Sequence, residues 1–442
     1  MRDYFGTDGV RGKANSELTP ELALRLGRAA VRALGGTERR VVVGRDTRVS
    51  GQMLESALVA GMLSEEASVL LVGVIPTPAV AFLTEELEAD IGAVISASHN
   101  TYEDNGIKFF GAGGLKLPDD TEKAIEAEFE GIEVLGEGGA VGEATRIAGA
   151  ERRYIDHLLG CINFDLDGFK VALDCANGAT YRVSPFAFES LGAKVETIGT
   201  EPDGHNINLE CGSTHPGRLA QLAAGMKADL GFAMDGDGDR CLCVDETGKV
   251  RDGDYILAVT ARYLKERDLL HPSLVVTTVM SNLGLFRALE ESGIDYRQTQ
   301  VGDRYVLEEM ESTGALVGGE QSGHIIFREH ATTGDGTLTA LLVAGMVKDT
   351  GRPLSELSNV MNKFPQVLVN VRPRSGRRLE EGMLVWETIR EYEEKLGKNG
   401  RIVVRSSGTE PVERVMVEAP SADKANEVAR SIADAIAREL DH

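Results

Sequence analysis

The segment ADIGAVISASHN, residues 89–100, decides the fold, because a closely similar segment, ADLGFAMDGDGD, follows at residues 228–239. A fainter third copy, TGALVGGEQSGH, occupies residues 313–324. Each copy contains a short apolar run of strand length that ends in small and polar residues. A pattern that recurs at long spacing indicates repeated structural units of similar fold.

Each copy is preceded by its own set of strand-like and helix-like segments, which open at VVVGRDTR (41–48), KVALDCANG (170–178) and LVVTTVMSN (274–282). Before the first of these segments, Thr19 is placed to cap a helix that has Pro20 at its first position, and after it another helix is expected from Ser50. Buried strands that alternate with helices are typical of α/β domains. We therefore expect three tandem, similar α/β domains with mixed, largely parallel sheets.

The C-terminal part of the chain has a different pattern. Residues 364–373 and 401–419 are strand-like, whereas residues 421–440 carry apolar side chains at helical spacing. This pattern predicts a small α+β domain. The four expected domains span residues 1–148, 149–248, 249–362 and 363–442, and they carry in turn the loops ISASHN, DGDGDR, GGEQSGH and RSSGTEP.

Composition and charge exclude several kinds of partner. The 442 residues are 42% hydrophobic and 26% charged, as in ordinary globular proteins. Acidic residues number 70 against 47 Lys and Arg, and the net charge of −23 repels nucleic acids and anionic membranes. We expect neither as a partner. An anionic substrate would need local cations or a metal ion.

The sequence shows no sign of export. Its start, MRDYFGTDGVRGK, has no apolar core of a signal peptide, and prolines interrupt the longest apolar stretch, residues 70–83. The five cysteines are an odd number and lack the paired spacing of a zinc site. Reduced thiols and a cytoplasmic location are therefore expected.

The segment DGDGDR, residues 235–240, predicts a metal site. Its carboxylates Asp235, Asp237 and Asp239 are all-oxygen ligands, which favour a hard cation. Carboxylates held about 4 Å apart repel by about 4 kcal/mol per pair at an effective dielectric constant of about 20, and a divalent ion removes this cost. An EF-hand is disfavoured because Arg240 stands where that loop needs Gly. A solvated acidic turn is the remaining alternative.

Ser98 follows the apolar run GAVIS at the place that the metal loop takes in the second copy, and this makes it a candidate nucleophile. Taken alone, a serine near a strand end is more often a helix cap or a turn residue. The sequence has no GxSxG elbow, and His99, as the next residue, does not make a serine-hydrolase triad. Phosphoryl transfer fits this arrangement better.

Two further loops suit a phosphorylated sugar. GGEQSGH (318–324) offers a carboxylate, an amide, a hydroxyl and an imidazole, which suit vicinal hydroxyl groups. RSSGTEP (405–411) and the nearby Arg414 offer guanidinium, hydroxyl and N–H donors to a phosphate. Polar turns are the alternative in both places. Ligands of open α/β sheets gather beyond the carboxyl ends of the strands, so the loops of the three copies are expected to face one site.

Five motifs, in this order and spacing, resemble the α-D-phosphohexomutases over essentially the whole chain: FGTDGVRG (5–12), ISASHNTYEDNGIKFF (95–110), DGDGDR, GGEQSGH and RSSGTEP. The resemblance implies three related α/β domains and a smaller fourth domain in a heart-shaped molecule around a central cleft. GEQSGH and FGTDGVRG are most similar to the phosphoglucosamine mutase branch, whereas phosphomannomutases and phosphoglucomutases typically have Met in place of Gln321. Thr101, where Pro is usual, and Val412 and Glu413 depart from the family pattern.

The resemblance also implies roles for individual residues. Ser98 would be the phosphoserine. One Mg²⁺ per chain would be held by Ser98, Asp235, Asp237 and Asp239. Among the catalytic residues, Arg11 would approach the phosphoserine, Arg240 would lie beside the metal ligands, and Lys108 and His324 would serve in proton transfer or charge stabilisation. Substrate would be bound by Glu320, Ser322, Arg405, Ser407, Gly408, Thr409 and Arg414.

The activity that the resemblance implies is isomerisation of a hexosamine phosphate. The phosphoryl group would move between the 6- and 1-positions through a hexose 1,6-bisphosphate, which acts as intermediate and activator, and the product would feed amino-sugar nucleotide and cell-wall synthesis. The alternatives are a phosphoglucomutase or phosphomannomutase and, in another class, a non-catalytic protein that binds a sugar phosphate or Ca²⁺. A second copy of the chain, in a homodimer, and a kinase acting on Ser98 are further candidate partners.

Overall fold

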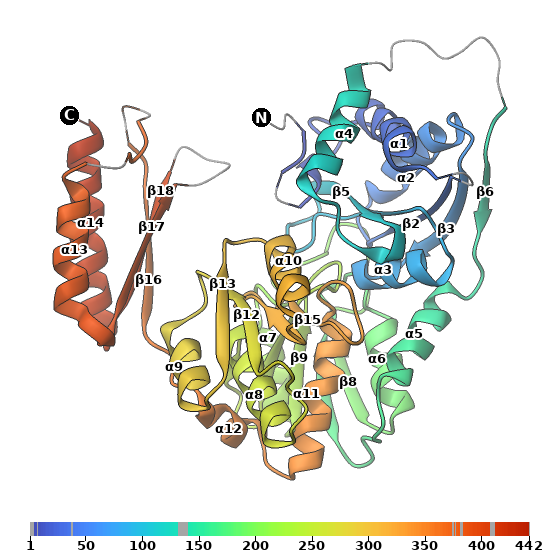
Figure 1. Cartoon of the computed structure of the whole chain (residues 1–442). Coiled ribbons are helices and arrows are strands. Elements are labelled where there is room, and N and C mark those ends of the chain that lie inside the picture. Colours follow the sequence, from blue (N-terminus) through green and yellow to red (C-terminus); the bar gives the residue numbers. More distant parts are fainter. Residues whose placement is uncertain are drawn as a thin grey trace. The chain divides into compact units, whose positions relative to one another are not determined.

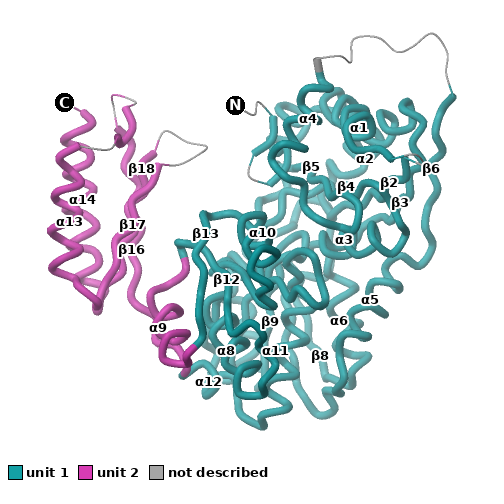
Figure 2. Tube along the Cα trace, viewed as in Figure 1, with its two compact units in different colours: residues 1–280, 294–359 teal, residues 281–293, 360–442 magenta. Residues whose placement is uncertain are grey.

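The computed structural model of the protein describes residues 4–6, 8–36, 39–130, 140–373, 375, 377–380, 383–406 and 412–441. Two compact units make up this structure (Figure 2). Unit 1 comprises residues 1–280 and 294–359, and unit 2 comprises residues 281–293 and 360–442. Among the described residues, no helix combines the length and the apolar character that crossing a membrane requires.

Unit 1 contains three sheets with helices packed against them (Figure 1). The first sheet has the strand order β1 (Val10–Lys13), β5 (Asp104–Gly111), β4 (Ile91–Ile95), β2 (Arg40–Arg45), β3 (Ser68–Val74) and β6 (Glu143–Arg146). The helices of this region are α1 (Pro20–Leu34), α2 (Gly51–Leu63), α3 (Thr77–Glu86) and α4 (Asp119–Glu130). β4, β2, β3 and β6 run parallel, whereas β1 and β5 pair antiparallel.

The second and third sheets follow along the chain. The second has the order β11 (Val250–Arg251), β10 (Cys241–Asp245), β9 (Leu230–Met234), β7 (Lys170–Asp174) and β8 (Lys194–Ile198), with helices α5 (Ala150–Gly160), α6 (Val183–Ser190) and α7 (Gly217–Met226). The third has the order β13 (Asp295–Thr299), β12 (Leu274–Thr278), β14 (Val317–Gly319) and β15 (Ile325–Phe327), with helices α8 (Gly253–Glu266), α10 (Asp303–Thr313), α11 (Gly336–Thr350) and α12 (Leu354–Leu357).

The three sheets share one internal pattern, which confirms the predicted repeat. The orders β3-β2-β4-β5, β8-β7-β9-β10 and β13-β12-β14-β15 each consist of three parallel strands followed by one antiparallel strand. The three copies of the sequence repeat form β4, β9 and β14, and in each case the next strand returns as a hairpin. β4 and β9 are buried along their whole length, as strands covered on both faces must be. The expected mixed, largely parallel α/β architecture is confirmed.

Local rules place the first two helices. The Thr19 hydroxyl accepts a hydrogen bond from the N–H of Leu22 at 3.2 Å, so the predicted cap begins α1. α1 and α2 then cross closely at two glycines. A Cβ on Gly27 would lie 2.2 Å from the carbonyl oxygen of Leu58, and one on Gly61 would meet that of Leu24 at 2.0 Å. This close crossing fixes the helix layer over the first sheet.

Unit 2 has the α+β character predicted for residues 363–442, and it also includes residues 281–293, which were predicted to lie in the third domain. Its antiparallel sheet has the order β16 (Gln366–Val371), β18 (Glu413–Glu418) and β17 (Arg401–Ser406). Its longer helices are α9 (Leu283–Glu291), α13 (Val385–Leu396) and α14 (Ala422–Asp441). The apolar stripe of α14 is buried in the core of this unit, as its spacing predicts. The buried Glu418 carboxylate accepts hydrogen bonds from the Asn282 amide and the Leu283 N–H, both at 3.0 Å, and these bonds fasten the start of α9 to the sheet.

Candidate active site

The loops that follow β4, β9 and β14 meet in unit 1. Ser98, near the start of the first loop, donates a hydrogen bond from its Oγ to Oδ2 of Asp235 in the second loop, at 2.6 Å. His324, in the third loop, places Nδ1 3.6 Å from Oδ2 of Asp239. All four side chains are buried. The structure thus brings together residues that lie in three different copies of the repeat.

The acidic loop places Asp235, Asp237 and Asp239 around one point. A carboxylate oxygen from each lies within 4.8 Å of the others, and all three residues are buried. Oδ1 of Asp237 and Oδ1 of Asp239 have no hydrogen-bond partner among the described residues. Burial and the two neighbouring carboxylates raise the pKa of Asp235 well above its usual value. Buried, unsatisfied oxygen ligands of like charge fit a hard divalent cation such as Mg²⁺.

The backbone of this loop depends on glycine. Gly238 has φ of +73°, and a Cβ at this position would lie 2.4 Å from Cγ2 of Thr180. Its N–H donates to the carbonyl oxygen of Asp235 at 3.1 Å, which closes the turn. Strands β9 and β10 flank the loop, so the arrangement is a hairpin loop and not the helix–loop–helix of an EF-hand.

Lys108, on β5, is a buried cation within the acidic cluster. Its Nζ lies 3.0 Å from Oδ2 of Asp237 and 2.8 Å from Oδ2 of Asp8. Burial alone would lower the pKa of Lys108, but the negative charges of Asp237, Asp8 and Asp239 outweigh it and raise the pKa. The side chain is therefore held as an ammonium ion, which suits charge stabilisation and does not suit a base.

Arg11 and Arg240 bring two guanidinium groups to the nucleophile. The Nε of each is buried and has no hydrogen-bond partner among the described residues. The Nδ1 of His99 lies 3.3 Å from the Ser98 Oγ. Burial, and after it the positive charges of Arg240 and Arg11, lower the pKa of His99 to about 4. Unsatisfied N–H donors on two guanidinium groups beside Ser98 fit an anionic group there.

His324 and Glu320 are already engaged with the protein. The Nε2 of His324 accepts a hydrogen bond from the N–H of Gly334 at 3.0 Å, while its Nδ1 faces Asp239. Glu320 accepts hydrogen bonds from the N–H of Gly302 at 3.2 Å and from the hydroxyl of Ser322 at 3.4 Å. Glu320 and Ser322 are half-buried, so this pair remains open to a ligand.

Sequence reasoning did not assign a role to three charged residues that surround the cluster. Asp8 pairs with Lys108, Lys116 and Arg11, and these cations outweigh burial and hold the pKa of Asp8 well below its usual value. Lys116 also forms an ion pair with Asp303, at the start of α10. Asp303, Asp239 and His324 form a second group whose ligand atoms lie within 4.8 Å of one another. Asp8 lies inside the motif FGTDGVRG, which was the one available signal.

In unit 2, the predicted phosphate-binding residues Arg405 and Arg414 face each other as direct neighbours on β17 and β18. Burial and the positive charge of Arg414 lower the pKa of Arg405. Like charges directly opposite one another destabilise a sheet, and an anion relieves this repulsion. Ser407, Gly408 and Thr409 lie outside the described residues, so their roles remain predictions.

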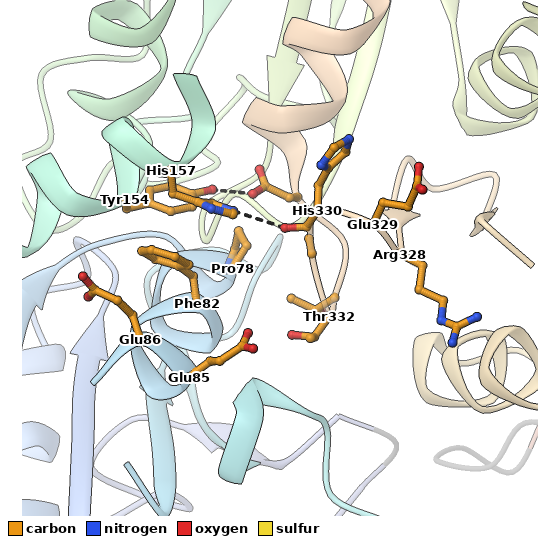
Figure 3. A pocket seen from close by; sticks show the side chains of 13 residues that line it. Pro78, Phe82, Glu85, Glu86, Tyr154, His157, Arg328, Glu329, His330 and Thr332 are labelled. Carbon is orange, nitrogen blue, oxygen red and sulfur yellow. Dashed lines mark hydrogen bonds between the residues drawn. The ribbon is translucent and has the colours of Figure 1, made fainter. Parts of the chain in front are cut away.

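A separate cavity of about 540 Å³ lies among α3, α5 and residues 328–335 (Figure 3). The hydroxyl of Tyr154 donates a hydrogen bond to Oδ2 of Asp335 at 2.6 Å, and burial raises the pKa of Asp335 to about 6. The N–H of Gly336, the residue after Asp335, donates to the carbonyl oxygen of Gly238 in the acidic loop at 2.9 Å. None of the predicted site residues lines it.

Comparisons with known proteins agree with this geometry. Models of the phosphoglucomutase/phosphomannomutase family match four consecutive parts of the chain: α/β/α domain I at residues 2–135, domain II at 152–248, domain III at 252–364 and the C-terminal domain at 365–435.

Curated relatives match over the full length. A phosphoglucosamine mutase of Streptomyces avermitilis is 52% identical over 447 residues and covers 99% of both chains. A phosphoglucosamine mutase of Brevibacillus brevis is 48% identical over 447 residues and covers 100% of both chains.

Solved structures show the same fold. A phosphoglucomutase/phosphomannomutase family protein from Burkholderia thailandensis superposes with a TM-score of 0.82 at 24% identity, over 98% of this chain and 97% of its own. An N-acetylphosphoglucosamine mutase of Aspergillus fumigatus, solved with GlcNAc-6P and magnesium, gives a TM-score of 0.71 at 18% identity, over 100% of this chain and 96% of its own. With four domain models in order and full-length relatives near half identity, the chain belongs to the phosphoglucomutase/phosphomannomutase family, the α-D-phosphohexomutases.

Proposed function

We propose that this phosphohexomutase interconverts glucosamine 6-phosphate and glucosamine 1-phosphate, with Ser98 as the residue that carries the phosphoryl group. The observation that supports this most strongly is the 2.6 Å contact between the Ser98 Oγ and Asp235, within a buried group of three carboxylates and beside Lys108. Full-length relatives at 48–52% identity, all phosphoglucosamine mutases, support the sugar.

Mg²⁺ would be held by Asp235, Asp237 and Asp239 together with an oxygen on Ser98. The set consists of oxygen ligands alone and includes two buried carboxylate oxygens that lack a partner among the described residues. When bound, Mg²⁺ neutralises negative charge on the phosphoryl group during transfer. Within the family, the N-acetylphosphoglucosamine mutase of Aspergillus fumigatus was solved in complex with magnesium.

The chain's own residues then account for the transfer. A hydroxyl of the sugar monophosphate attacks the phosphorus on Ser98, a new oxygen–phosphorus bond forms, and the bond from phosphorus to the Ser98 Oγ breaks. Arg11, Arg240 and Lys108 would stabilise the oxygens of the moving group, and the buried Nε donors of both arginines, which lack a partner among the described residues, support this role. The proton of the attacking hydroxyl is transferred in the end to the Ser98 oxygen, which is thereby released as a hydroxyl group.

The second half of the cycle reverses these roles. The 1,6-bisphosphate turns around, and the Ser98 hydroxyl attacks its other phosphorus, which restores the phosphoserine and releases the isomeric monophosphate. Glu320 and Ser322 would bind sugar hydroxyls, and Arg405, Arg414 and the segment 407–409 would bind a phosphate group of the substrate. Water must be excluded during the turn, because hydrolysis would end the cycle.

Phosphorus NMR tests the proposal. The purified protein is given Mg²⁺, a trace of glucose 1,6-bisphosphate, and glucosamine, glucose or mannose 6-phosphate in separate tubes. The proposal predicts that glucosamine 6-phosphate is converted to its 1-phosphate fastest. Faster conversion of glucose or mannose 6-phosphate would replace the sugar and keep the mechanism. No conversion of any of the three by protein phosphorylated on Ser98 would refute the mutase mechanism.

A further inference from the structure

The loop that carries Ser98 is fixed by two side chains from outside it, Arg48 and Asn208. Both are buried, Arg48 at 1% and Asn208 at 3% exposure. We propose that Arg48 and Asn208, hereafter the carbonyl clamp, are positioning residues that hold the Ser98 hydroxyl against the acidic loop. The proposal rests on the proposed function, because it assigns the clamp to the phosphoryl-transfer step at Ser98.

Arg48 uses all five of its N–H donors inside the protein. Nε donates to Oδ2 of Asp46 at 2.9 Å. The four N–H groups of Nη1 and Nη2 bond to four carbonyl oxygens of one loop, those of Ser98, Asn100, Thr101 and Asp104. A charged group whose four Nη donors all bond to carbonyl oxygens of residues 98–104 defines the path of that segment. Burying a guanidinium is costly, and here the carbonyl oxygens of the Ser98 loop offset that cost.

Asn208 reaches two of the same carbonyl oxygens from another part of the fold. It lies between β8 and α7, and its Nδ2 donates to the carbonyl oxygens of Ser98 and Asn100, both at 2.8 Å. Each of these two oxygens therefore accepts one hydrogen bond from Arg48 and one from Asn208. A carbonyl oxygen has two lone pairs, so both acceptors are saturated.

The backbone of Ser98 is fixed by hydrogen bonds at both its N–H and its carbonyl oxygen. Ser98 has φ of +51°, in the left-handed region that a non-glycine residue rarely adopts. Its N–H donates to Oγ of Ser96 at 2.9 Å, and that hydroxyl donates to Asp46 at 2.6 Å. Both backbone polar groups of Ser98 are thus bonded to buried side chains. A strained backbone that its surroundings fix in this way is typical of pre-organised sites.

The clamp also contacts the acidic loop. A Cβ on Gly236 would lie 2.6 Å from Nδ2 of Asn208 and 2.6 Å from the carbonyl oxygen of Ser98. Gly236 lies between Asp235 and Asp237, so the amide of Asn208 is packed between the Ser98 loop and the acidic loop. Two more bonds hold the segment around Arg48 against neighbouring loops of the second sheet: the N–H of Val49 donates to the carbonyl oxygen of Gly204 at 2.9 Å, and the hydroxyl of Thr47 donates to that of Asn177 at 2.6 Å. Asn208 therefore ties the nucleophile to the acidic loop.

The test uses two substitutions of Asn208 and one matched control. Asn208→Asp keeps the size of the side chain and tolerates its φ of +58°, but turns a carboxylate oxygen toward the two carbonyl oxygens. Asn208→Gly removes the amide without adding charge and also tolerates this φ. The control is Asn206→Asp in the same loop, because the Asn206 Nδ2 donates to the carbonyl oxygen of Glu201 at 2.9 Å, within its own loop.

Two rates are measured at a temperature where circular dichroism shows every variant folded. The first is phosphorylation of Ser98 by glucose 1,6-bisphosphate, followed by intact mass, and the second is turnover of glucosamine 6-phosphate. We expect both Asn208 variants to lose about 30-fold or more in phosphorylation rate and in kcat, with KM changed by less than about threefold, because misplacement of a nucleophile slows transfer without weakening binding. Asn206→Asp should stay within about twofold of wild type.

Wild-type rates for the Asn208 variants, or an equal loss in Asn206→Asp, would overturn the proposal. If the Asn208 variants do not fold, Arg48→Lys is tested instead, because it keeps the positive charge and loses the planar group with five donors. An unchanged phosphorylation rate in Arg48→Lys would also overturn the proposal. The wild-type measurements distinguish a failure of the clamp proposal from a failure of the proposed function. Phosphorylation without turnover of glucosamine 6-phosphate refutes the sugar and leaves the clamp testable, whereas no phosphorylation in wild type refutes both.

Discussion

The transfer centre of unit 1 and the arginine pair of unit 2 handle charge in opposite ways. Around Ser98, cations are paired with carboxylates, and Lys108 forms ion pairs with both Asp8 and Asp237. On the sheet of unit 2, Arg405 and Arg414 lie directly opposite each other with charges of the same sign. Ion pairs within the protein hold the side chains of the first site, whereas on the sheet of unit 2 two guanidinium groups repel each other. We therefore expect substitutions in the first site to slow the transfer step, and substitutions of the arginine pair to weaken phosphate binding.

The largest effect is expected for the nucleophile itself. Ser98→Ala removes the oxygen that carries the phosphoryl group, and turnover should fall by about 10⁴-fold or more, with no phosphoryl group added to the protein. Turnover is followed by phosphorus NMR and incorporation by intact mass. Ser312→Ala, on the exposed face of α10, is the control and should match wild type. Unchanged turnover in Ser98→Ala would remove the phosphoserine from the mechanism.

A substitution in the acidic loop should reduce activity without reducing the stability of the protein. Asp235→Asn removes one of three repelling carboxylates, so the metal-free protein should melt at the same temperature or higher. Turnover should fall by roughly 100- to 1000-fold and Mg²⁺ affinity should drop, because one ligand and its charge are lost. Calorimetric titration with Mg²⁺ and thermal melts measure both. Asp229→Asn, an exposed carboxylate just before β9, is the control. Undiminished Mg²⁺ affinity in Asp235→Asn would show that this loop is not the metal site.

The arginine pair should affect binding more than chemistry. Arg405→Gln removes one charge-assisted phosphate contact, so KM for the sugar phosphate should rise about 10- to 100-fold while kcat changes less. Because the like-charge repulsion is relieved, the melting temperature should not fall. Arg430→Gln makes the same charge change on the exposed face of α14 and should leave KM unaltered. Equal KM values for the two variants would argue against phosphate binding by this pair.

The smallest effect concerns stability alone and lies at the start of α11. The pKa of Asp335 is raised from 3.8 to about 6, so the folded state holds its proton more tightly than the unfolded state. Ionisation of Asp335 therefore lowers the free energy of unfolding. This loss is absent below about pH 4, grows as the pH rises to 6, and reaches about 3 kcal/mol at neutral pH. Asp335→Asn should therefore gain stability relative to wild type as the pH rises.

Thermal melts of wild type and Asp335→Asn at pH 5 and pH 7.5 check this sign. The exposed Asp156→Asn is the control, and its difference from wild type should not depend on pH. A pH-independent difference for Asp335→Asn would show that this carboxyl does not titrate between these values.

Much of the fold followed from local patterns in the sequence. Apolar runs of strand length predicted β4 and β9, and the Thr19 cap predicted the start of α1. The internal repeat also placed Ser98 and the acidic loop at equivalent strand ends, which is why the sequence alone predicted that they are neighbours. Their 2.6 Å contact joins residues 137 positions apart.

The supporting residues could not be predicted in the same way. Arg48 is a charged residue that is buried, against the usual tendency of its type, and the four carbonyl oxygens that it binds lie 50 or more positions away. Asn208 bonds to a loop 108 to 110 positions distant. Lys116 and Asp303 meet only because the first and third sheets pack in one unit. No local pattern reports such contacts. The four domain boundaries likewise remain predictions.

Single-turnover transfer from the phosphorylated protein shows whether Ser98 passes its phosphoryl group to the sugar. Protein labelled with ³²P on Ser98 is mixed with excess glucosamine 6-phosphate and Mg²⁺ and quenched over milliseconds to seconds. A phosphoserine mechanism predicts that label leaves Ser98 and appears in a hexosamine 1,6-bisphosphate at a rate at least equal to kcat. Label that stays on Ser98, or that leaves as inorganic phosphate while the sugar phosphate is isomerised, would contradict it.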